Sequence, residues 1–387
     1  MILLHLLRWL KANTTMRFAV LLREGIGDLQ AEFEKLGPVF AWNELPPTDI
    51  LTRPAKRGLG FFERRDTRSA TAATIPTSRD GFGDYMREAG LGLIYSNTIT
   101  NGEILAALKG TGCPVVTHVH ELGYWISHRM DPGNVEQNRR YTTQFIAVSH
   151  AVRENLVANV GIAPERIEVI HEFIPVLQER REDEARRIRE QLGIPLDSMV
   201  VGGAGTTDWR KAPELFVQLA AIVKRRRPES TVHFVWVGGE HEGPAFQALW
   251  HDVVRGGVAD RVHFVGVRPN PLDYFSMIDL FAMVSREDPF PLVALEAAAL
   301  GRPVLAFDGS GGTRELVEDD AGVVVPYLDI ETMAAAVHEL SDDPARRARL
   351  GARAAQKVRE RHEVGVTAPR VLAILQRLLG PASLPTR

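Results

Sequence analysis

Two acidic residues, Asp288 and Glu296, stand eight positions apart in the stretch DPFPLVALE, on either side of Pro291. A carboxylate can accept two hydrogen bonds from a vicinal diol, so this pair could hold both ends of an extended polar ligand. Proline at the first helical position and Gly301 after the last predict a helix over about residues 291–300. The plainer alternative is that Asp288 only caps this helix and that Glu296 faces solvent.

The start of this helix could also bind a ligand. The first-turn amides, among them those of Leu292 and Val293, have no partner inside the helix and could bind phosphate. Glu296 lies roughly 7.5 Å along the helix at about 1.5 Å per residue, whereas Asp288 stays in the preceding loop. One acid could therefore hold a ribose and the other a second sugar, with a diphosphate between them at the helix start.

The segments around this helix predict a parallel sheet. From residue 199 onward, short β-branched runs alternate with helical segments. The predicted strands are MVVGGAG, TVHFVWVGG, RVHFVG, DLFAMVS, RPVLAF and AGVVVP, and the predicted helices begin near Ala212, Gly243, Pro271, Pro291, Gly312 and Ile330. Strands with few polar positions, each followed by a helix, indicate a parallel sheet covered on both faces, as in a Rossmann-like domain.

The first half repeats this pattern less clearly, with predicted strands RFAVLL, GLIYSN, PVVTHVH, QFIAVS and RIEVI. Residues 53–80 carry arginines and small polar residues with little periodicity, which favours a mobile excursion. We therefore predict an α/β chain of two doubly wound domains facing a cleft. The predicted boundaries are 1–174 for the N-terminal domain, 175–198 for a linker helix, 199–365 for the C-terminal domain, and 366–387 for a C-terminal helix and tail.

Length and composition agree with two domains and narrow the class of protein. The chain has 387 residues, of which 45% are hydrophobic and 25% charged. A chain of this length is too large for a single hydrophobic core and is expected to form two domains. A formal net charge of −3 gives no basic footprint for nucleic acid. The single cysteine, Cys113, favours a reducing compartment, so we expect a cytoplasmic protein.

No stretch approaches the roughly 18 uninterrupted apolar residues that a membrane span requires. The opening MILLHLLRWLK lacks the positive start of a signal peptide. Its apolar residues recur at helical spacing: Ile2, Leu3, Leu6, Leu7 and Leu10. We predict a core-facing helix here, and peripheral contact with the inner face of a membrane is the alternative.

These residues resemble the retaining nucleotide-sugar glycosyltransferases of family 4, which have the two-domain GT-B fold. The signature of that family is a glutamate, seven residues and a second glutamate. Asp288 matches the first acid and Glu296 the second, with Glu287 as an adjacent substitute. Downstream, AAALGRPVLAFDGSGGTRELVEDDAGVVVP is similar to a family run, with Gly301, Pro303, Gly311, Gly312, Glu315 and Gly322 at matching positions. FIAVSHAVRENLVANVGIAPERIEVI is similar to the segment that closes the family's first domain.

Two further segments carry the resemblance. In GAGTTDWRKAPELF, Lys211 matches a lysine that in the family neutralises the donor diphosphate as the glycosidic bond breaks. Thr206 stands where the family has an arginine and Ala212 where glycine is common, which leaves Arg210 to supply the second positive charge. In THVHELG, His120 matches a histidine that reaches the donor sugar from across the cleft.

The resemblance implies a retaining glycosyltransferase that moves a sugar from a nucleotide-diphosphate sugar to an acceptor hydroxyl, in cell-surface polysaccharide or lipopolysaccharide synthesis. Its partners would be that donor and a glycan or lipid-linked acceptor, without cofactor, metal or nucleic acid. The implied catalytic residues are Lys211, Arg210, Asp288 and His120. The implied donor-binding residues are Glu296, Glu287, Thr206, Gly205, Phe290, Leu292, Val293, Gly311 and Gly312.

Plainer interpretations of single residues stay open beside these roles. Lys211 and Arg210 could be a first-turn charge pair, although cations disfavour a helix start. His120 could be a structural histidine, and Gly311 with Gly312 a strand-to-helix turn. The sequence has no HExxH or paired-cysteine spacing and no GxGxxG after an early strand, which argues against a metalloenzyme and an NAD enzyme.

Two departures from the family pattern keep other functions open. Family members open with a strand and a glycine-rich loop, whereas this chain opens at the predicted helix, so we expect the first strand of the N-terminal sheet to be missing. The second departure is Thr206 in place of arginine. Together they motivate a non-catalytic glycan- or partner-binding protein of the same fold, and a nucleotide-sugar epimerase is a further alternative.

Overall fold

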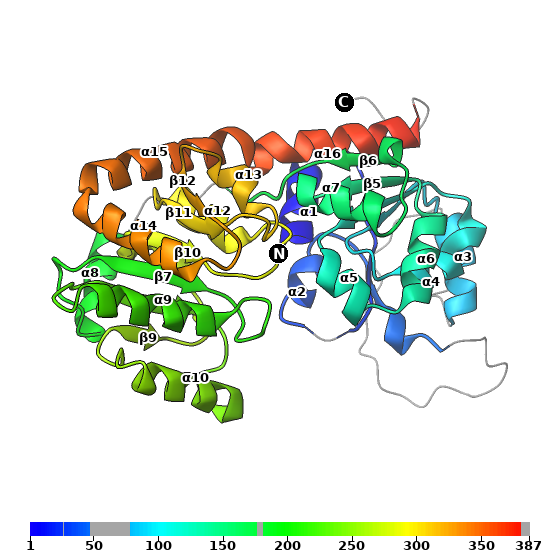
Figure 1. Ribbon diagram of the computed structural model, residues 1–387. Helices are drawn as coiled ribbons and strands as arrows, with labels where there is room; N and C mark the ends of the chain where they lie inside the picture. The colour runs from blue at the N-terminus through cyan, green and yellow to red at the C-terminus, as the bar shows by residue number, and fades with distance from the viewer. Residues whose placement is uncertain (26, 47–77, 176–180, 381–387) are drawn as a thin grey trace.

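The computed structural model describes residues 1–25, 27–46, 78–175 and 181–380. These residues form two lobes that lie side by side, each built on a parallel β-sheet with helices packed against it (Figure 1). The predicted excursion over 53–80 falls outside the described residues except for its last three positions, which lie at the start of a helix. The predicted α/β fold class is confirmed.

The C-terminal lobe is built on a six-stranded sheet, and each of its strands falls within a predicted run. The strands are β7 (Val200–Ala204), β8 (His233–Val237), β9 (Val262–Phe264), β10 (Leu280–Met283), β11 (Val304–Phe307) and β12 (Gly322–Val325). They pair in parallel in the order β12-β11-β10-β7-β8-β9. In this doubly wound order the direction of winding reverses between β7 and β10, and ligands of such sheets bind outside the carboxyl ends of the strands at that point.

Helices cover both faces of this sheet because its strands are apolar on both sides. Successive side chains of a strand point to opposite faces, so Val200 and Val201 lie in two different apolar clusters. The helices are α9 (Pro213–Arg226), α10 (Gly243–Arg255), α11 (Pro271–Met277), α12 (Leu292–Ala299), α13 (Thr313–Val317), α14 (Ile330–Asp342) and α15 (Pro344–Arg361). Proline in the first turn of α9, α10, α11 and α15 agrees with its fixed φ and missing amide proton.

The N-terminal lobe contains a four-stranded parallel sheet in the order β3-β4-β5-β6 and a separate parallel pair, β1-β2. The strands are β1 (Val20–Leu22), β2 (Val39–Ala41), β3 (Ile94–Ser96), β4 (Val115–Val119), β5 (Gln144–Ala147) and β6 (Ile167–Val169). Its helices are α1 (Ile2–Asn13), α2 (Gln30–Glu34), α3 (Arg79–Glu88), α4 (Gly102–Leu108), α5 (Gly123–Arg129), α6 (Pro132–Tyr141) and α7 (His150–Ala158). Three short 3-10 helices, η1 (Trp42–Glu44), η2 (Lys109–Thr111) and η3 (Pro164–Arg166), complete it. Strand β2 was not predicted, whereas the other five strands fall within predicted runs.

The amphipathic stripe of α1 faces the protein core. Leu4, Leu6 and Leu10 are buried, in one cluster with Val371 and Ile374 of the last helix, α16 (Val364–Leu379). The prediction of a core-facing helix is therefore confirmed. Among the described helices, none combines the length and the apolar content that crossing a bilayer would require.

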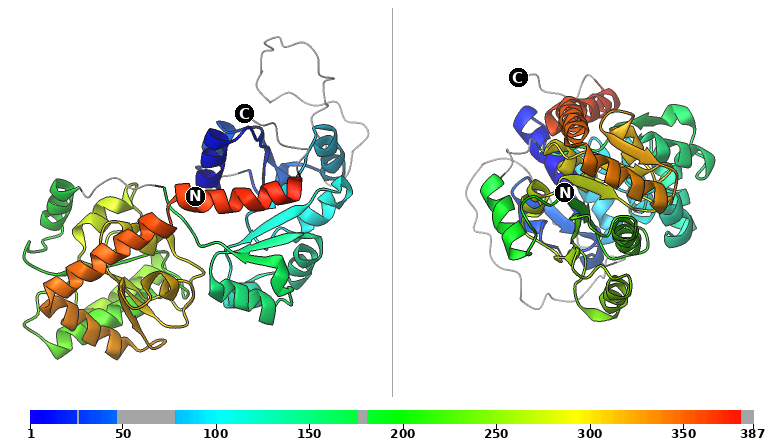
Figure 2. Two further views of the ribbon diagram at one scale, coloured as in Figure 1. Left: turned by 90° about the horizontal axis from the view of Figure 1, so that it is seen from above. Right: turned by 60° about the vertical axis from the view of Figure 1, so that its left-hand side comes forward.

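The chain passes between the lobes twice, and the two passages touch. Ile174 donates to the carbonyl of His362 at 2.9 Å, and Val364 donates to the carbonyl of Ile174 at 2.9 Å. The second passage leads into α16, which runs back along the N-terminal lobe (Figure 2). We therefore count α16 with the N-terminal lobe, and α8 (Glu182–Gln191) to α15 with the C-terminal lobe.

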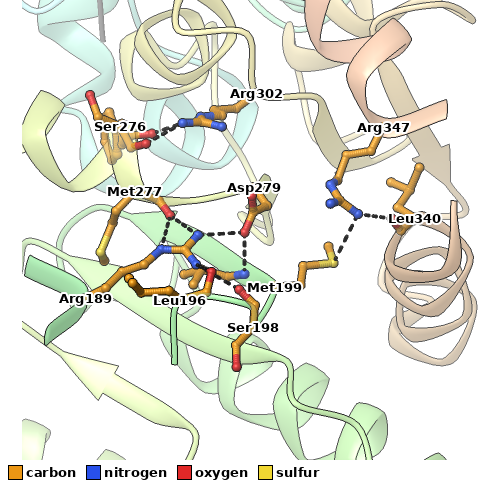
Figure 3. A network of polar contacts seen from close by, with 12 residues as sticks. Arg189, Leu196, Ser198, Met199, Ser276, Met277, Asp279, Arg302, Leu340 and Arg347 are labelled. Atoms are coloured by element: carbon orange, nitrogen blue, oxygen red, sulfur yellow. Dashed lines mark hydrogen bonds and ion pairs between the residues drawn. The ribbon is translucent and has the colours of Figure 1, made fainter. Parts of the chain in front are cut away.

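Helix α8, which forms the described part of the predicted linker, is anchored at the amino ends of β7 and β10. Arg189 forms an ion pair of 2.9 Å with Asp279 and donates to the carbonyls of Met277, Leu196 and Ser198 (Figure 3). A cavity of about 500 Å³ lies beside this network. It opens at the opposite edge of the sheet from the switch-point loops, so it is separate from the site described next.

Candidate active site

Lys211 and Asp288 meet at the switch point of the six-stranded sheet. Lys211 lies in the loop after β7 and Asp288 in the loop after β10. The Lys211 Nζ is 2.5 Å from Asp288 Oδ2, and both side chains are largely buried. Arg210 Nη1 lies 3.6 Å from the same oxygen. Two cations therefore surround one carboxylate at the edge where a doubly wound sheet binds its ligand.

The turn that presents Lys211 is held by Asp208. One Asp208 carboxylate oxygen accepts from the amides of Arg210 at 2.9 Å and Lys211 at 3.0 Å. Thr206 Oγ1 donates to the other at 2.6 Å, so the residue in the position of the family's arginine supports the turn. Ala212, which ends the turn, has φ of 55°. Glycine is favoured in this left-handed region, which explains why it is common at that position in the family.

Three glycines of the predicted site are required by close packing. A Cβ on Gly205 would lie 2.9 Å from Lys211 Cγ and Cδ, and a Cβ on Gly311 would lie 1.9 Å from the Asp288 carbonyl oxygen. One on Gly312 would lie 2.4 Å from the Pro289 carbonyl oxygen. Gly205 thus makes room for Lys211 within its own loop, and Gly311 and Gly312 let the loop after β11 approach the loop after β10.

Glu296 projects from α12 without a partner. Its carboxylate is partly buried and forms no hydrogen bond or ion pair with any residue that the structure describes. Burial raises the pKa of Glu296 to about 7. Within the described chain, the amides of Leu292 and Val293 in the first turn of α12 also lack a hydrogen-bond partner. Unpaired polar groups at such positions cost free energy, so they are candidates for ligand binding.

His120 lies at the carboxyl end of β4 and is held by residues that the sequence did not single out. Its Nδ1 is 2.5 Å from Glu172 Oε1, and its Nε2 is 3.2 Å from Asn97 Oδ1. Burial lowers the pKa of His120, but the negative charge and hydrogen bond of Glu172 outweigh it, and the net shift is upward. Glu172 is buried, and its second carboxylate oxygen has no partner among the described residues.

A sequence signal for Glu172 existed. The dipeptide His-Glu follows β4 as His120-Glu121, and it follows β6 as His171-Glu172. Parallel strands end at one edge of a sheet, so both dipeptides had to lie there. The repeat could have identified Glu172, although it could not have shown which acid faces His120.

Glu287 lies at the contact between the lobes. Its two carboxylate oxygens accept from the backbone amides of Tyr124 at 2.7 Å and Trp125 at 3.3 Å, at the start of α5. Glu287 was predicted to bind the donor, and in the structure its carboxylate is already occupied by these amides. Phe290, also predicted, is buried, and its ring lies 5.2 Å from those of both His171 and His362, tilted by 33° and 36°.

Glu315 makes a second contact between the lobes. Its carboxylate accepts from the amides of His150 and Ala151 and from His171 Nε2, at 3.0, 3.2 and 2.7 Å. His150, His171 and Glu315 also form a possible metal-ligand group, with donor atoms within 4.8 Å of one another. The hydrogen bonds account for this arrangement without a metal, and the prediction that no metal is required remains a prediction.

The structure therefore brings together residues from both lobes. Lys211, Arg210 and Asp288 are in contact, and the loop that carries His120 reaches them through Leu122, which packs against Gly311. A cavity of about 600 Å³ adjoins this region, lined by the end of β12 and by residues that include Asp308, Arg314 and Tyr327.

Two family models match the chain, one in each half. The model described as "Glycosyltransferase Family 4" matches residues 68–176, and the model described as "Glycosyl transferases group 1" matches residues 198–343. The second match contains Lys211, Asp288 and Glu296, and the first contains His120.

Curated relatives are about 30% identical to this chain over the region that aligns. The D-inositol 3-phosphate glycosyltransferase of Kineococcus radiotolerans is 31% identical over 249 residues, covering 60% of this chain and 57% of the relative. The enzyme of the same name from Thermobispora bispora is 30% identical over 278 residues, covering 67% and 64%. The matched region thus spans about three fifths of the length of these relatives.

Solved structures share the fold over nearly the whole chain. Anabaena Alr3699/HepE, in a complex with UDP and glucose, superposes with a TM-score of 0.76 at 20% identity and covers 96% of this chain and 94% of its own. A glycosyltransferase from Rickettsia africae gives 0.74 at 14% identity, covering 98% and 94%. Since the fold is that of GT-B glycosyltransferases and the two family matches fall on its two halves, the chain belongs to the family 4 glycosyltransferases.

Proposed function

We propose that this protein is a retaining glycosyltransferase that moves a sugar from a nucleotide-diphosphate sugar to an acceptor hydroxyl. The observation that carries the proposal is the contact between Lys211 and Asp288 at the switch point of the C-terminal sheet. A transferase of this kind must above all stabilise the negative charge that develops on the leaving diphosphate. A fixed lysine beside an open helix start meets that need.

The other residues of the site divide into those that would bind the diphosphate, the ribose and the transferred sugar. Lys211, helped by Arg210 and by the free amides of α12, would hold the diphosphate. Glu296 would accept hydrogen bonds from the ribose hydroxyls, since its carboxylate has no other described partner. Asp288 and His120 would orient the transferred sugar from opposite lobes, and no residue is assigned as a nucleophile.

The proposed donor and acceptor come from the ligands and names of similar proteins. Anabaena Alr3699/HepE was crystallised with UDP-glucose, which makes a uridine diphosphate sugar the first donor to test. The names of the curated relatives make D-inositol 3-phosphate the first acceptor to test. An oligosaccharide or lipid-linked glycan, as expected from the sequence for polysaccharide or lipopolysaccharide synthesis, is the competing acceptor.

The decisive experiment is an assay of donor turnover with and without acceptors. Purified protein is incubated with UDP-glucose, UDP-N-acetylglucosamine or GDP-mannose, alone and with D-inositol 3-phosphate or an oligosaccharide. Release of nucleoside diphosphate together with a new glycoside is expected for one pair, and NMR of the product should show the anomeric configuration of the donor. An inverted product would contradict retention. If the protein neither binds nor turns over any of these donors, the proposal that it is a glycosyltransferase is contradicted.

A non-catalytic glycan- or partner-binding protein is the second candidate, and Thr206 favours it. Thr206 is uncharged, so it cannot supply the positive charge that an arginine would bring to a diphosphate. Its hydroxyl instead donates to Asp208. This candidate predicts that the protein binds nucleotide or glycan without turning over any donor, and the same assay, combined with calorimetry, separates the two.

A further inference from the structure

We propose that Glu287 and Glu315 are positioning residues of this enzyme. Glu287, in the loop after β10, and Glu315, in helix α13, each bind backbone amides at the start of a helix in the N-terminal lobe. Together they fix the placement of Lys211 and Asp288 relative to His120. Only the kinetic consequence of this inference rests on the proposed function, because the contacts themselves can be tested without any substrate.

Glu287 supplies a cap that α5 lacks. The residue before α5, Leu122, offers no side-chain hydrogen bond to the helix. The amides of Tyr124 and Trp125 would therefore be unpaired, as first-turn amides are, and they donate instead to the two oxygens of Glu287. A carboxylate is favoured there because the start of a helix carries partial positive charge.

Aromatic side chains extend this first contact. The ring of Tyr124 lies 4.5 Å from that of Trp209, which belongs to the loop that presents Lys211. The guanidinium of Arg286 lies 5.3 Å from the Trp209 ring, and Arg286 forms an ion pair of 2.5 Å with Glu214. The contact is therefore a packed patch and not a lone hydrogen bond.

Glu315 caps α7 in the same manner, alongside the helix's own cap. Ser149 accepts from the amide of Val152, which leaves the amides of His150 and Ala151 without a partner in the helix. Glu315 accepts from both of these amides, and its carboxylate is held in place by His171 at 2.7 Å.

The loop that carries Glu287 and the loop that leads into α13, the helix of Glu315, are hydrogen-bonded to each other at the candidate active site. Glu287 directly precedes Asp288, whose amide donates to the Ser310 carbonyl at 2.7 Å. The Asp288 carbonyl in turn accepts from Gly312, three residues before Glu315, at 3.2 Å. A shift of one lobe against the other would therefore strain the same loops that hold Asp288 against Lys211.

A distance measurement tests the geometry without substrate. Spin labels are placed on exposed positions of the two lobes, at Gln137→Cys in α6 and Val254→Cys in α10, in a Cys113→Ser background. Pulsed electron resonance should give one narrow distance for the parent protein. The double variant Glu287→Ala/Glu315→Ala should give a broader distribution shifted to longer distances. An unchanged distribution would overturn the proposal.

Kinetics test the consequence, with hydrolysis of UDP-glucose as the probe. The double variant should lose at least tenfold in kcat/KM, and Glu287→Gln should retain more activity than Glu287→Ala, because its amide oxygen still accepts one hydrogen bond. Equal activity of all variants would count against a positioning role. If the parent protein does not hydrolyse UDP-glucose, UDP-glucose is excluded as the donor. The distance measurement still tests whether Glu287 and Glu315 fix the two lobes relative to each other.

Two carboxylates that cap helices within the C-terminal lobe provide matched controls. Asp329 accepts from the amide of Thr332 in α14, and Asp343 accepts from that of Arg346 in α15. Asp329→Ala and Asp343→Ala remove a cap of the same kind without touching the other lobe. They should lower the melting temperature but leave the label distance and kcat/KM unchanged. A change in distance in these controls equal to that in the double variant would show that general destabilisation is the cause.

Discussion

Glu296 is a partly buried carboxyl group that has no hydrogen-bond or ion-pair partner among the residues that the structure describes. Its pKa of about 7 in the folded protein exceeds the ordinary value of 4.5. The folded state therefore binds this proton more tightly than the unfolded state, and the residue reduces stability progressively as pH rises from about 4.5 to about 7. A carboxylate that lowers stability in this way is typical of a ligand-binding residue.

Replacement of Glu296 by glutamine should separate these two properties. Because Glu296→Gln removes the desolvated charge, we expect the variant to be about 1–3 kcal/mol more stable than the parent at pH 8, with a smaller difference, under about 1 kcal/mol, at pH 5. Urea unfolding at both pH values measures this difference. Affinity for UDP-glucose, measured by calorimetry, should fall. The exposed Glu190→Gln serves as control, and a parent protein whose stability does not fall between pH 5 and 8 would contradict the shifted pKa.

Lys211 and Arg210 should contribute unequally to turnover. Lys211 Nζ is 2.5 Å from Asp288 whereas Arg210 Nη1 is 3.6 Å away, so Lys211 is the more closely engaged cation. We expect Lys211→Ala to reduce kcat for donor turnover by about 100-fold or more, and Arg210→Ala to reduce it less. The exposed Lys109→Ala should leave kcat unchanged. The reverse order of the two effects would reassign the principal charge to Arg210.

The loops after β10 and β11 are the elements on which the site depends, and two glycines allow their packing to be tested. Gly309 and Gly311 both have positive φ, but only Gly311 lies against the backbone of Asp288. Gly309→Ala should cost about 1–2 kcal/mol from its conformation alone. Gly311→Ala should cost more and should also reduce donor affinity, because the Asp288 loop must move. Thermal unfolding and calorimetry compare the pair, and equal costs would contradict the close approach.

At the level of elements, the sequence predicted most of the secondary structure. The strands of the C-terminal sheet are apolar runs, and four of its helices carry proline in their first turn, so local signals were sufficient there. Strand β2, which has three residues, was not predicted. The strand order, which places the loops of Lys211 and Asp288 side by side, could not be read from local patterns, because it depends on which crossovers pack on which face.

For the whole molecule, α16 ties the end of the described chain to the N-terminal lobe. Ile374 is fully buried in the cluster that contains α1 and residues of β4 and β5. We expect Ile374→Ala to lower the free energy of unfolding by about 2–4 kcal/mol. It should also raise the rate of amide hydrogen exchange in β4 and β5 more than in the strands of the C-terminal sheet. The control Val366→Ala changes an exposed residue of the same helix and should cost less than about 0.5 kcal/mol. Equal exchange in both sheets would contradict this assignment of α16.

Local patterns in the sequence were enough to identify the apolar runs, the helices that follow them and the residue types of the candidate site, because these depend on neighbours within a few positions. The tertiary structure decided how those residues are used. Glu287 and Asp288 are adjacent in the chain, yet one binds amides of the other lobe and the other pairs with Lys211. Glu172 meets His120 across 52 positions of the chain. Such pairings arise from strand order and lobe contact, and for that reason no local pattern could have predicted them.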